Sequence, residues 1–111
     1  MTTHRFVADH WHNVLGTRPP AFTVASGDTV ITDTLDAAGW DKDGVQVSRG
    51  PNPMNGPIFI EGAEPGDALR VEIMRMTPNR ATGWTRSSLA ANVVDPESVR
   101  DLPSREVANW A

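Results

Sequence analysis

Apolar and charged side chains alternate through residues 68–75, and this pattern restricts the fold more than any other feature of the sequence. In an extended chain the apolar side chains share one face and the charged ones share the other. The apolar residues are Leu69, Val71 and Ile73, and the charged residues are Arg70 and Glu72. Pro65-Gly66 suits the two central positions of a type II turn. The sequence therefore predicts two strands, residues 57–61 and 68–75, paired across this turn.

A second alternation lies on either side of the dipeptide Gly27-Asp28. Apolar or β-branched residues occupy alternate positions before it, at Phe22 and Val24, and after it, at Val30, Thr32 and Thr34. Such a pattern around a turn dipeptide predicts a β-hairpin. Near the C-terminus Asp95-Pro96 resembles the N-cap and first turn of a helix, and Ser104 is a candidate cap for another short turn. We therefore expect a mainly β fold, a β-sandwich or a barrel-like structure, with short helical segments near the C-terminus.

Size and charge narrow the class of protein. The 111 residues contain no cysteine and carry a net charge of −4, which fits one small domain without disulfides or thiolate metal sites. Arginine and lysine are scattered, whereas a nucleic-acid surface needs a basic stripe. No apolar run approaches the ~18 residues of a membrane span, and the first residues lack the features of a signal peptide. These observations predict a cytoplasmic protein that binds neither nucleic acid nor membrane.

Residues 37–56 are rich in Gly, Asp, Asn and Pro and predict a long loop, a kind of segment that is often functional. Asp36 precedes this loop at a strand end, where binding residues collect. His10 and His12 share one face of an extended chain, so they are candidate metal ligands or ordinary polar and capping residues. Glu61 lies at another strand end and is a candidate catalytic carboxylate.

Three further acidic residues lie in predicted turns, and two interpretations stay open for them. They are Asp28, Glu64 and Asp67. Asp28 is most simply a turn residue. Glu64 and Asp67 are either solvated turn residues or, together with Glu61, carboxylates dense enough to bind a hard cation or to shift one another's pKa.

The motifs of the chain, taken in order, resemble those of the acetamidase/formamidase family. The stretch from Asn52 to Ile73 contains NPMNGP and EGAEPGD followed by an apolar strand pattern, and upstream lie GDTV from Gly27 and TLDA from Thr34. The resemblance implies a mostly β, oligomeric enzyme that hydrolyses short aliphatic amides such as formamide and acetamide to a carboxylate and ammonia. The length predicts a single domain, and the resemblance implies instead that residues 1–111 are the N-terminal portion of a longer chain.

Amide hydrolysis assigns roles to particular residues. A metal-activated water would attack the amide, with zinc or calcium as the divalent metal. Asp36, His10 and His12 would contribute ligands, Asp36 and Glu61 would be the catalytic carboxylates, and Asn52, Gly56 and Pro57 would shape the substrate pocket. Because the remaining ligands would come from elsewhere, we expect the isolated chain to be inactive.

A different class of function also fits the sequence: a non-catalytic β module, or a subunit that complements a second chain. Several apolar residues after the last predicted strand have no obvious partner in their own segment. They are Trp84, Leu89, Val93, Val94, Val107 and Trp110. Exposed apolar residues promote association, so we expect a homo-oligomer or a complex with a complementary C-terminal chain.

Overall fold

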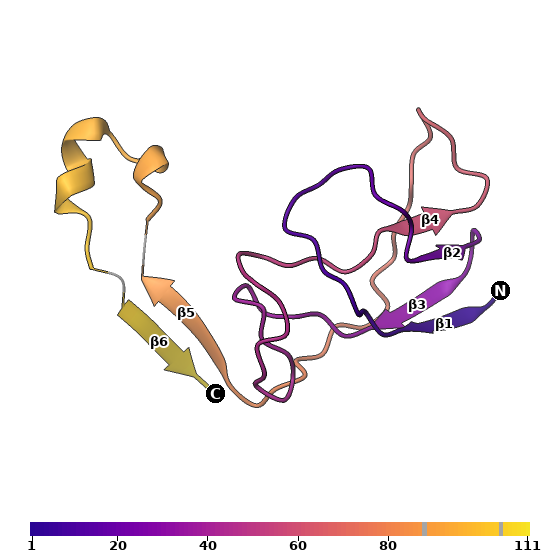
Figure 1. Cartoon of the computed structure of the whole chain (residues 1–111), viewed down its shortest axis with the longest axis horizontal. Helices are drawn as coiled ribbons and strands as arrows, with labels where there is room; N and C mark the ends of the chain where they lie inside the picture. The colour runs from indigo at the N-terminus through magenta and orange to yellow at the C-terminus, as the bar shows by residue number, and fades with distance from the viewer. Residues whose placement is uncertain (88, 105) are drawn as a thin grey trace. The chain divides into compact units, whose positions relative to one another are not determined.

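The computed structural model describes residues 1–87, 89–104 and 106–111 and divides the chain into two compact units, Met1–Asn79 and Arg80–Ala111. Short strands form small two-stranded sheets, and the helical part consists of two 3-10 segments near the C-terminus (Figure 1). The described part contains no closed barrel, and none of its helices is long and apolar enough to cross a membrane. The structure is therefore mostly non-helical with small sheets, and its short helical segments lie near the C-terminus as predicted. The finer expectation of a β-sandwich or barrel-like structure is not confirmed by the described residues.

The first unit contains two parallel strand pairs. Strand β1 (Thr3–Phe6) pairs with β3 (Thr29–Thr32), and β2 (Phe22–Val24) pairs with β4 (Ile58–Ile60). The predicted hairpin over residues 22–34 is therefore wrong in its pairing, although both strands and the turn between them exist. Alternation predicts which face a side chain occupies, but it does not predict which strand lies alongside.

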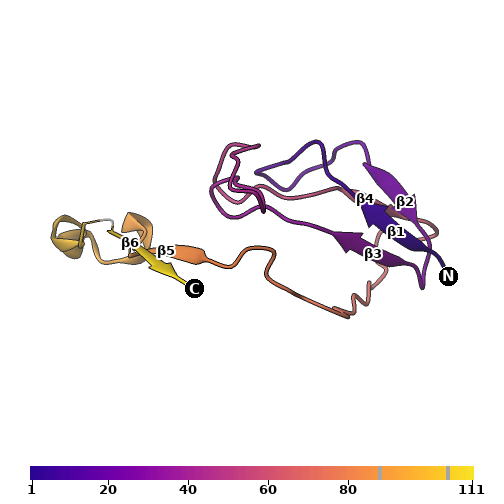
Figure 2. The same ribbon diagram turned by 90° about the horizontal axis from the view of Figure 1, so that it is seen from below.

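Aromatic side chains join the two parallel pairs. The ring of Phe22 in β2 lies 4.8 Å from that of Phe6 and 5.8 Å from that of His4, both in β1. These centroid separations lie in the range preferred by interacting aromatic pairs. The turn after Val24 thus carries the chain from one small sheet to the next, and Figure 2 shows the two pairs within the first unit.

The second predicted strand, residues 68–75, is absent as a strand. The turn itself is present, because the amide of Asp67 donates to the carbonyl of Glu64 at 3.0 Å and Gly66 has a φ of 101°. Beyond it, residues 68–78 belong to no strand, and β4 pairs with β2 instead. The prediction is wrong because a strand needs a partner for its backbone groups, and the described chain offers none here.

In the second unit β5 (Gly83–Ser87) pairs antiparallel with β6 (Glu106–Trp110). Between them lie η1 (Ala91–Val93) and η2 (Pro96–Asp101). Asp95 occupies the N-cap of η2 as predicted, although its side chain accepts no capping hydrogen bond. The turn predicted at Ser104 is replaced by strand β6, whose pairing with β5 outweighs the local capping pattern.

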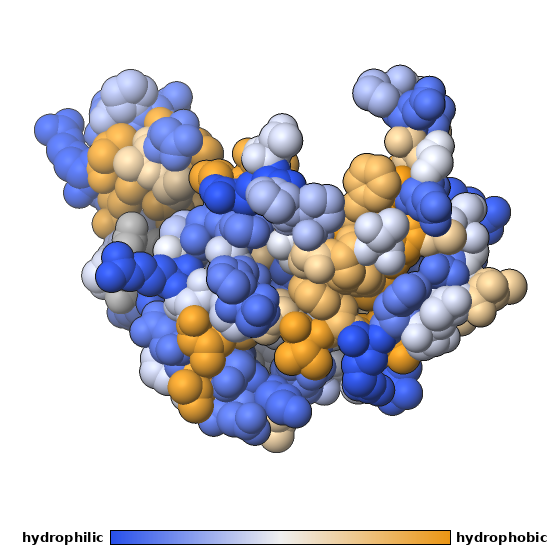
Figure 3. All heavy atoms as spheres, turned by 45° about the vertical axis from the view of Figure 1, so that its right-hand side comes forward, coloured by the Kyte–Doolittle hydropathy of each residue, from blue (hydrophilic) through white to orange (hydrophobic). Residues whose placement is uncertain are grey.

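Large apolar side chains remain accessible across the described residues, and none of them is fully buried. Figure 3 shows hydrophobic residues open to view among hydrophilic ones. In the second unit the exposed fraction is 59% for Leu89, 66% for Val93 and 62% for Trp110, and Val107 is also exposed. Trp84 and Val94, which were expected to be exposed as well, are half-buried. Exposed apolar side chains therefore occur in both units.

Candidate functional site

Asp36 organises the beginning of the long loop. Its Oδ1 atom accepts hydrogen bonds from the amides of Ala38 at 2.9 Å and Trp40 at 3.0 Å. Gly39 lies between them, is buried and has a φ of 89°, and a Cβ atom there would overlap the backbone of Ser48. Asp41 repeats the arrangement with the amides of Asp43 and Val45, both at 2.9 Å. The loop is thus folded by carboxylates that accept backbone N–H groups.

Two asparagines anchor the next part of the loop. Nδ2 of Asn13 donates to the carbonyls of Arg49 at 3.0 Å and Pro51 at 2.8 Å. Nδ2 of Asn55 donates to Oγ1 of Thr32 at 3.0 Å and to the carbonyl of Asp33 at 2.7 Å. The buried Oδ1 of Asn55 accepts no hydrogen bond from the described residues. Neither asparagine was singled out as an anchor from the sequence, because the acceptors lie more than twenty residues away along the chain.

A β-bridge brings the histidine segment beside this loop. The amide of His12 donates to the carbonyl of Met54 at 3.1 Å, and the amide of Met54 donates back to His12 at 2.8 Å. The carbonyl of Pro57 accepts from the amide of Ala21 at 2.8 Å. Two segments about forty residues apart are therefore fixed side by side by backbone hydrogen bonds.

His10, His12 and Gly56 line one open hollow of about 360 Å³. The other lining residues are Phe6, Asp9, Arg18, Pro19 and Ala21. Gly56 is buried with a φ of 99°, and His12 is half-buried. The structure thus brings together both predicted imidazoles and one of the three residues predicted to shape a substrate pocket.

The remaining predicted site residues lie at other positions. The lining of the hollow includes neither Asp36 nor Glu61, and Glu61 is exposed with its amide donating to Val24 at 2.8 Å. Asn52 is exposed with a φ of 50°, and its amide donates to Ala37 at 2.8 Å. Glu64 is an exposed turn residue, and its amide donates to Oδ2 of Asp67 at 2.9 Å.

A metal site does not fit the described residues. His10 is largely exposed, and its Nδ1 donates to Oδ1 of Asp9 at 2.9 Å, a hydrogen bond that lowers the pKa of the Asp9 carboxyl. A hydrolytic metal needs about three protein ligands. Within residues 1–87, 89–104 and 106–111, no group of three His, Asp or Glu side chains is placed to hold a metal ion. The hollow alone therefore lacks a complete set of ligands.

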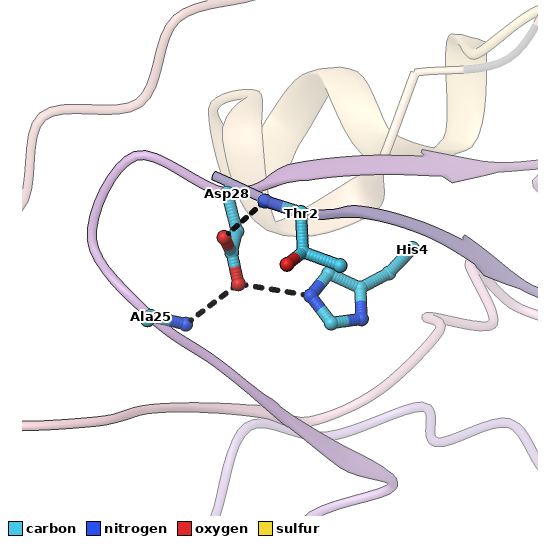
Figure 4. Close-up of polar contacts among 4 residues, drawn as sticks. All are labelled: Thr2, His4, Ala25 and Asp28. Atoms are coloured by element: carbon cyan, nitrogen blue, oxygen red, sulfur yellow. Dashed lines mark hydrogen bonds and ion pairs between the residues drawn. The ribbon is translucent and has the colours of Figure 1, made fainter.

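A polar cluster not expected from the sequence lies at the turn before β3 (Figure 4). Nε2 of His4 lies 2.9 Å from Oδ2 of Asp28, which also accepts from the amide of Ala25 at 3.0 Å. Oδ1 of Asp28 accepts from the amide of Thr2 at 2.7 Å. These bonds, the one from His4 first, lower the pKa of Asp28 to about 2. Asp28 is a turn residue, as predicted, and it also ties β1 to the turn.

Comparison with known proteins identifies no relative: no family model matches the chain, and no curated protein or solved structure is significantly similar to it.

Proposed function

We propose that this chain supplies the substrate hollow of an enzyme that hydrolyses short aliphatic amides, in the manner implied by its resemblance to the acetamidase/formamidase family. The observation that carries the proposal is the placement of His10, His12 and Gly56 around one hollow. The motif loop of residues 52–57 and the histidine segment are brought together by the bridge between His12 and Met54. Three of the residues proposed for this chemistry therefore lie around the same hollow.

The lining suits a small amide. Phe6, Pro19 and Ala21 contribute apolar surface, while the imidazoles and the Arg18 guanidinium contribute polar groups. A short amide offers one carbonyl acceptor and one NH₂ donor, and an imidazole can serve either of them. Small-molecule sites typically combine apolar walls with a few polar groups of this kind.

The chemistry of hydrolysis requires more than this chain provides. The developing oxyanion must be stabilised and the leaving amine protonated. Asp36 folds its own loop, and Glu61 lies outside the lining of the hollow. The proposed enzyme therefore draws its remaining catalytic groups from further polypeptide, which would also cover the exposed apolar side chains of both units.

A second candidate is a non-catalytic β module that complements another chain. The exposed apolar residues and two-stranded sheets favour it, because sheets this small present unpaired edges. This candidate predicts association without any affinity for amides at the hollow, so amide binding separates the two functions.

The test is an NMR titration of the ¹⁵N-labelled protein with acetamide. Ligand efficiency limits acetamide to roughly 6 kcal/mol of binding free energy, a Kd of tens of micromolar at best, so the titration extends to millimolar concentration. We expect saturable shifts at the amides of His10, His12 and Gly56. Shifts that do not saturate, or that occur throughout the chain, would contradict the proposal.

Two glycine variants provide a matched comparison. Gly56→Ala adds a methyl group at a residue that lines the hollow, 3.2 Å from the backbone nitrogen of Ile58. Gly62→Ala adds one at an exposed turn with open space around it. Both positions have positive φ, so both substitutions strain the backbone. Acetamide binding should fall only in the first variant. His12→Ala, which keeps the backbone bridge to Met54, should also weaken binding without changing the fold.

A further inference from the structure

Residues 67–76 form an exposed segment whose backbone has no strand partner in the described chain. Figure 1 draws it as a plain tube between β4 and β5. The exposed fraction is 59% for Leu69, 81% for Val71 and 70% for Ile73. Nη2 of Arg70 lies 3.8 Å from Oε2 of Glu72, so these two side chains occupy the same side, as in a strand. The segment has the side-chain pattern of a strand without a neighbour.

The order of side chains in this segment is self-complementary. If two copies run antiparallel about a two-fold axis through Val71, each residue lies opposite a residue of opposite charge or similar polarity. The opposed pairs are Asp67 with Arg75, Ala68 with Met74, Leu69 with Ile73, Arg70 with Glu72, and Val71 with itself. One face of the paired strands is apolar, with an Asp67–Arg75 pair at each end. The other face carries the Arg70–Glu72 pairs.

Neighbouring registers lose this complementarity. An axis through Arg70 would place the two Arg70 side chains opposite each other, and an axis through Glu72 would do the same for the two glutamates. Like charges directly opposite in a sheet are destabilising, whereas opposite charges are stabilising. A one-residue slip would move apolar residues opposite charged ones. Among these registers, only the one centred on Val71 places apolar residues opposite apolar residues and opposite charges opposite each other on both faces.

We propose that residues 67–75 are a homodimerisation strand that pairs antiparallel with the same segment of a second copy, with the two-fold axis at Val71. Pairing would satisfy backbone N–H and C=O groups that are now unpaired and would cover the apolar face. The contact is small, so we expect a dimer of micromolar affinity. The inference does not depend on amide hydrolysis, because the segment lies outside the lining of the hollow.

Cysteine cross-linking tests the register, since the chain has no cysteine of its own. In the proposed dimer Val71→Cys faces its own copy at about 5 Å between Cα atoms, within disulfide range. Ile73→Cys is the matched control on the same face, and its two copies would lie about 13 Å apart along the strands. We expect mild oxidation to link the first variant and not the second. Equal linking of both, or of neither, would overturn the proposal.

Charge reversal tests the pairing independently. Arg70→Glu and Glu72→Arg should each weaken the dimer about tenfold in sedimentation velocity, because each replaces two attractive pairs by repulsive ones. The double variant Arg70→Glu/Glu72→Arg restores opposite charges and should restore the dimer. Arg49→Glu, an exposed reversal outside the segment, should have no effect. A monomeric wild-type protein, or a double variant whose dimer is no tighter than that of either single variant, would contradict the proposal.

Discussion

Nε2 of His4 lies 2.9 Å from Oδ2 of Asp28, and this contact fastens the first strand to the turn between β2 and β3. The same carboxylate accepts from the amides of Thr2 and Ala25, so it satisfies donors from two segments. The pKa of Asp28 is consequently lowered to about 2 from an ordinary value of 3.8. Protonation of this group removes an acceptor on which the first unit depends.

The first prediction concerns acid stability. A carboxyl group whose pKa is lower in the folded state stabilises the fold fully above its unfolded pKa, here 3.8. That contribution is lost as the pH falls from 3.8 towards the folded value of about 2. The thermal midpoint of wild-type protein should therefore fall steeply over this interval. Asp28→Asn should be less stable at neutral pH and show a flatter dependence in the same interval.

Asp43→Asn is the matched control for this prediction, because Asp43 is an exposed acidic residue of the same unit. The thermal midpoint of Asp43→Asn should depend on pH in the same way as that of the wild-type protein. If Asp28→Asn and Asp43→Asn have the same pH dependence, the contacts of Asp28 do not contribute to stability in the way described.

The second prediction concerns Gly83, which lies opposite Trp110 across the β5–β6 pair. A Cβ atom at this position would overlap the indole ring, whereas Gly16 has open space around it. Replacing glycine by alanine in compatible backbone stabilises by about 0.4–1 kcal/mol. At Gly83 the exposed ring of Trp110 must move aside for the added methyl group, which removes the contact of the ring with β5. Gly83→Ala should therefore lower hydrogen-exchange protection in β5 and β6, and Gly16→Ala should not. Unchanged protection in Gly83→Ala would contradict the observed packing.

The third prediction separates a structural role of Asp36 from a catalytic or metal-binding one. Asp36→Ala removes the acceptor for two backbone amides and should destabilise the loop by about 2 kcal/mol. Asp36→Asn keeps an oxygen acceptor and should preserve both the loop spectrum and acetamide binding. If Asp36→Asn leaves the fold intact but abolishes binding, the charge of Asp36 acts on the ligand directly.

Part of this fold follows from local sequence chemistry. The strands around Gly27-Asp28, the turn at Pro65-Gly66 and the helix start at Asp95 all depend on neighbouring residues. Strand partners depend on residues far away along the chain, and β1, with its polar sequence Thr3–Phe6, gives little local signal. Residues 68–75 have the alternation of a strand but no strand partner among the described residues. Alternation predicts which side chains share a face, and it does not predict whether another strand lies alongside.

The candidate site was predictable to a similar extent. Histidine is a common functional residue type, so His10 and His12 are candidates from the sequence, and Gly56 belongs to a recognisable motif. The backbone hydrogen bonds between their two segments, including the bridge between His12 and Met54, bring them to one hollow. The cluster of His4 and Asp28 escaped prediction because twenty-four residues separate its members. The side-chain types in the sequence indicate candidate site residues, whereas the tertiary contacts determine which of these residues lie close together.

The most direct test of the account is ammonia release from formamide and acetamide by the purified 111-residue chain, with zinc or calcium added. We predict no release above the uncatalysed rate, because the hollow lacks both a three-ligand metal group from the described residues and the proposed carboxylates Asp36 and Glu61. Turnover of about one per second or faster, ordinary for enzymes, would contradict it and show that this chain holds a complete catalytic set.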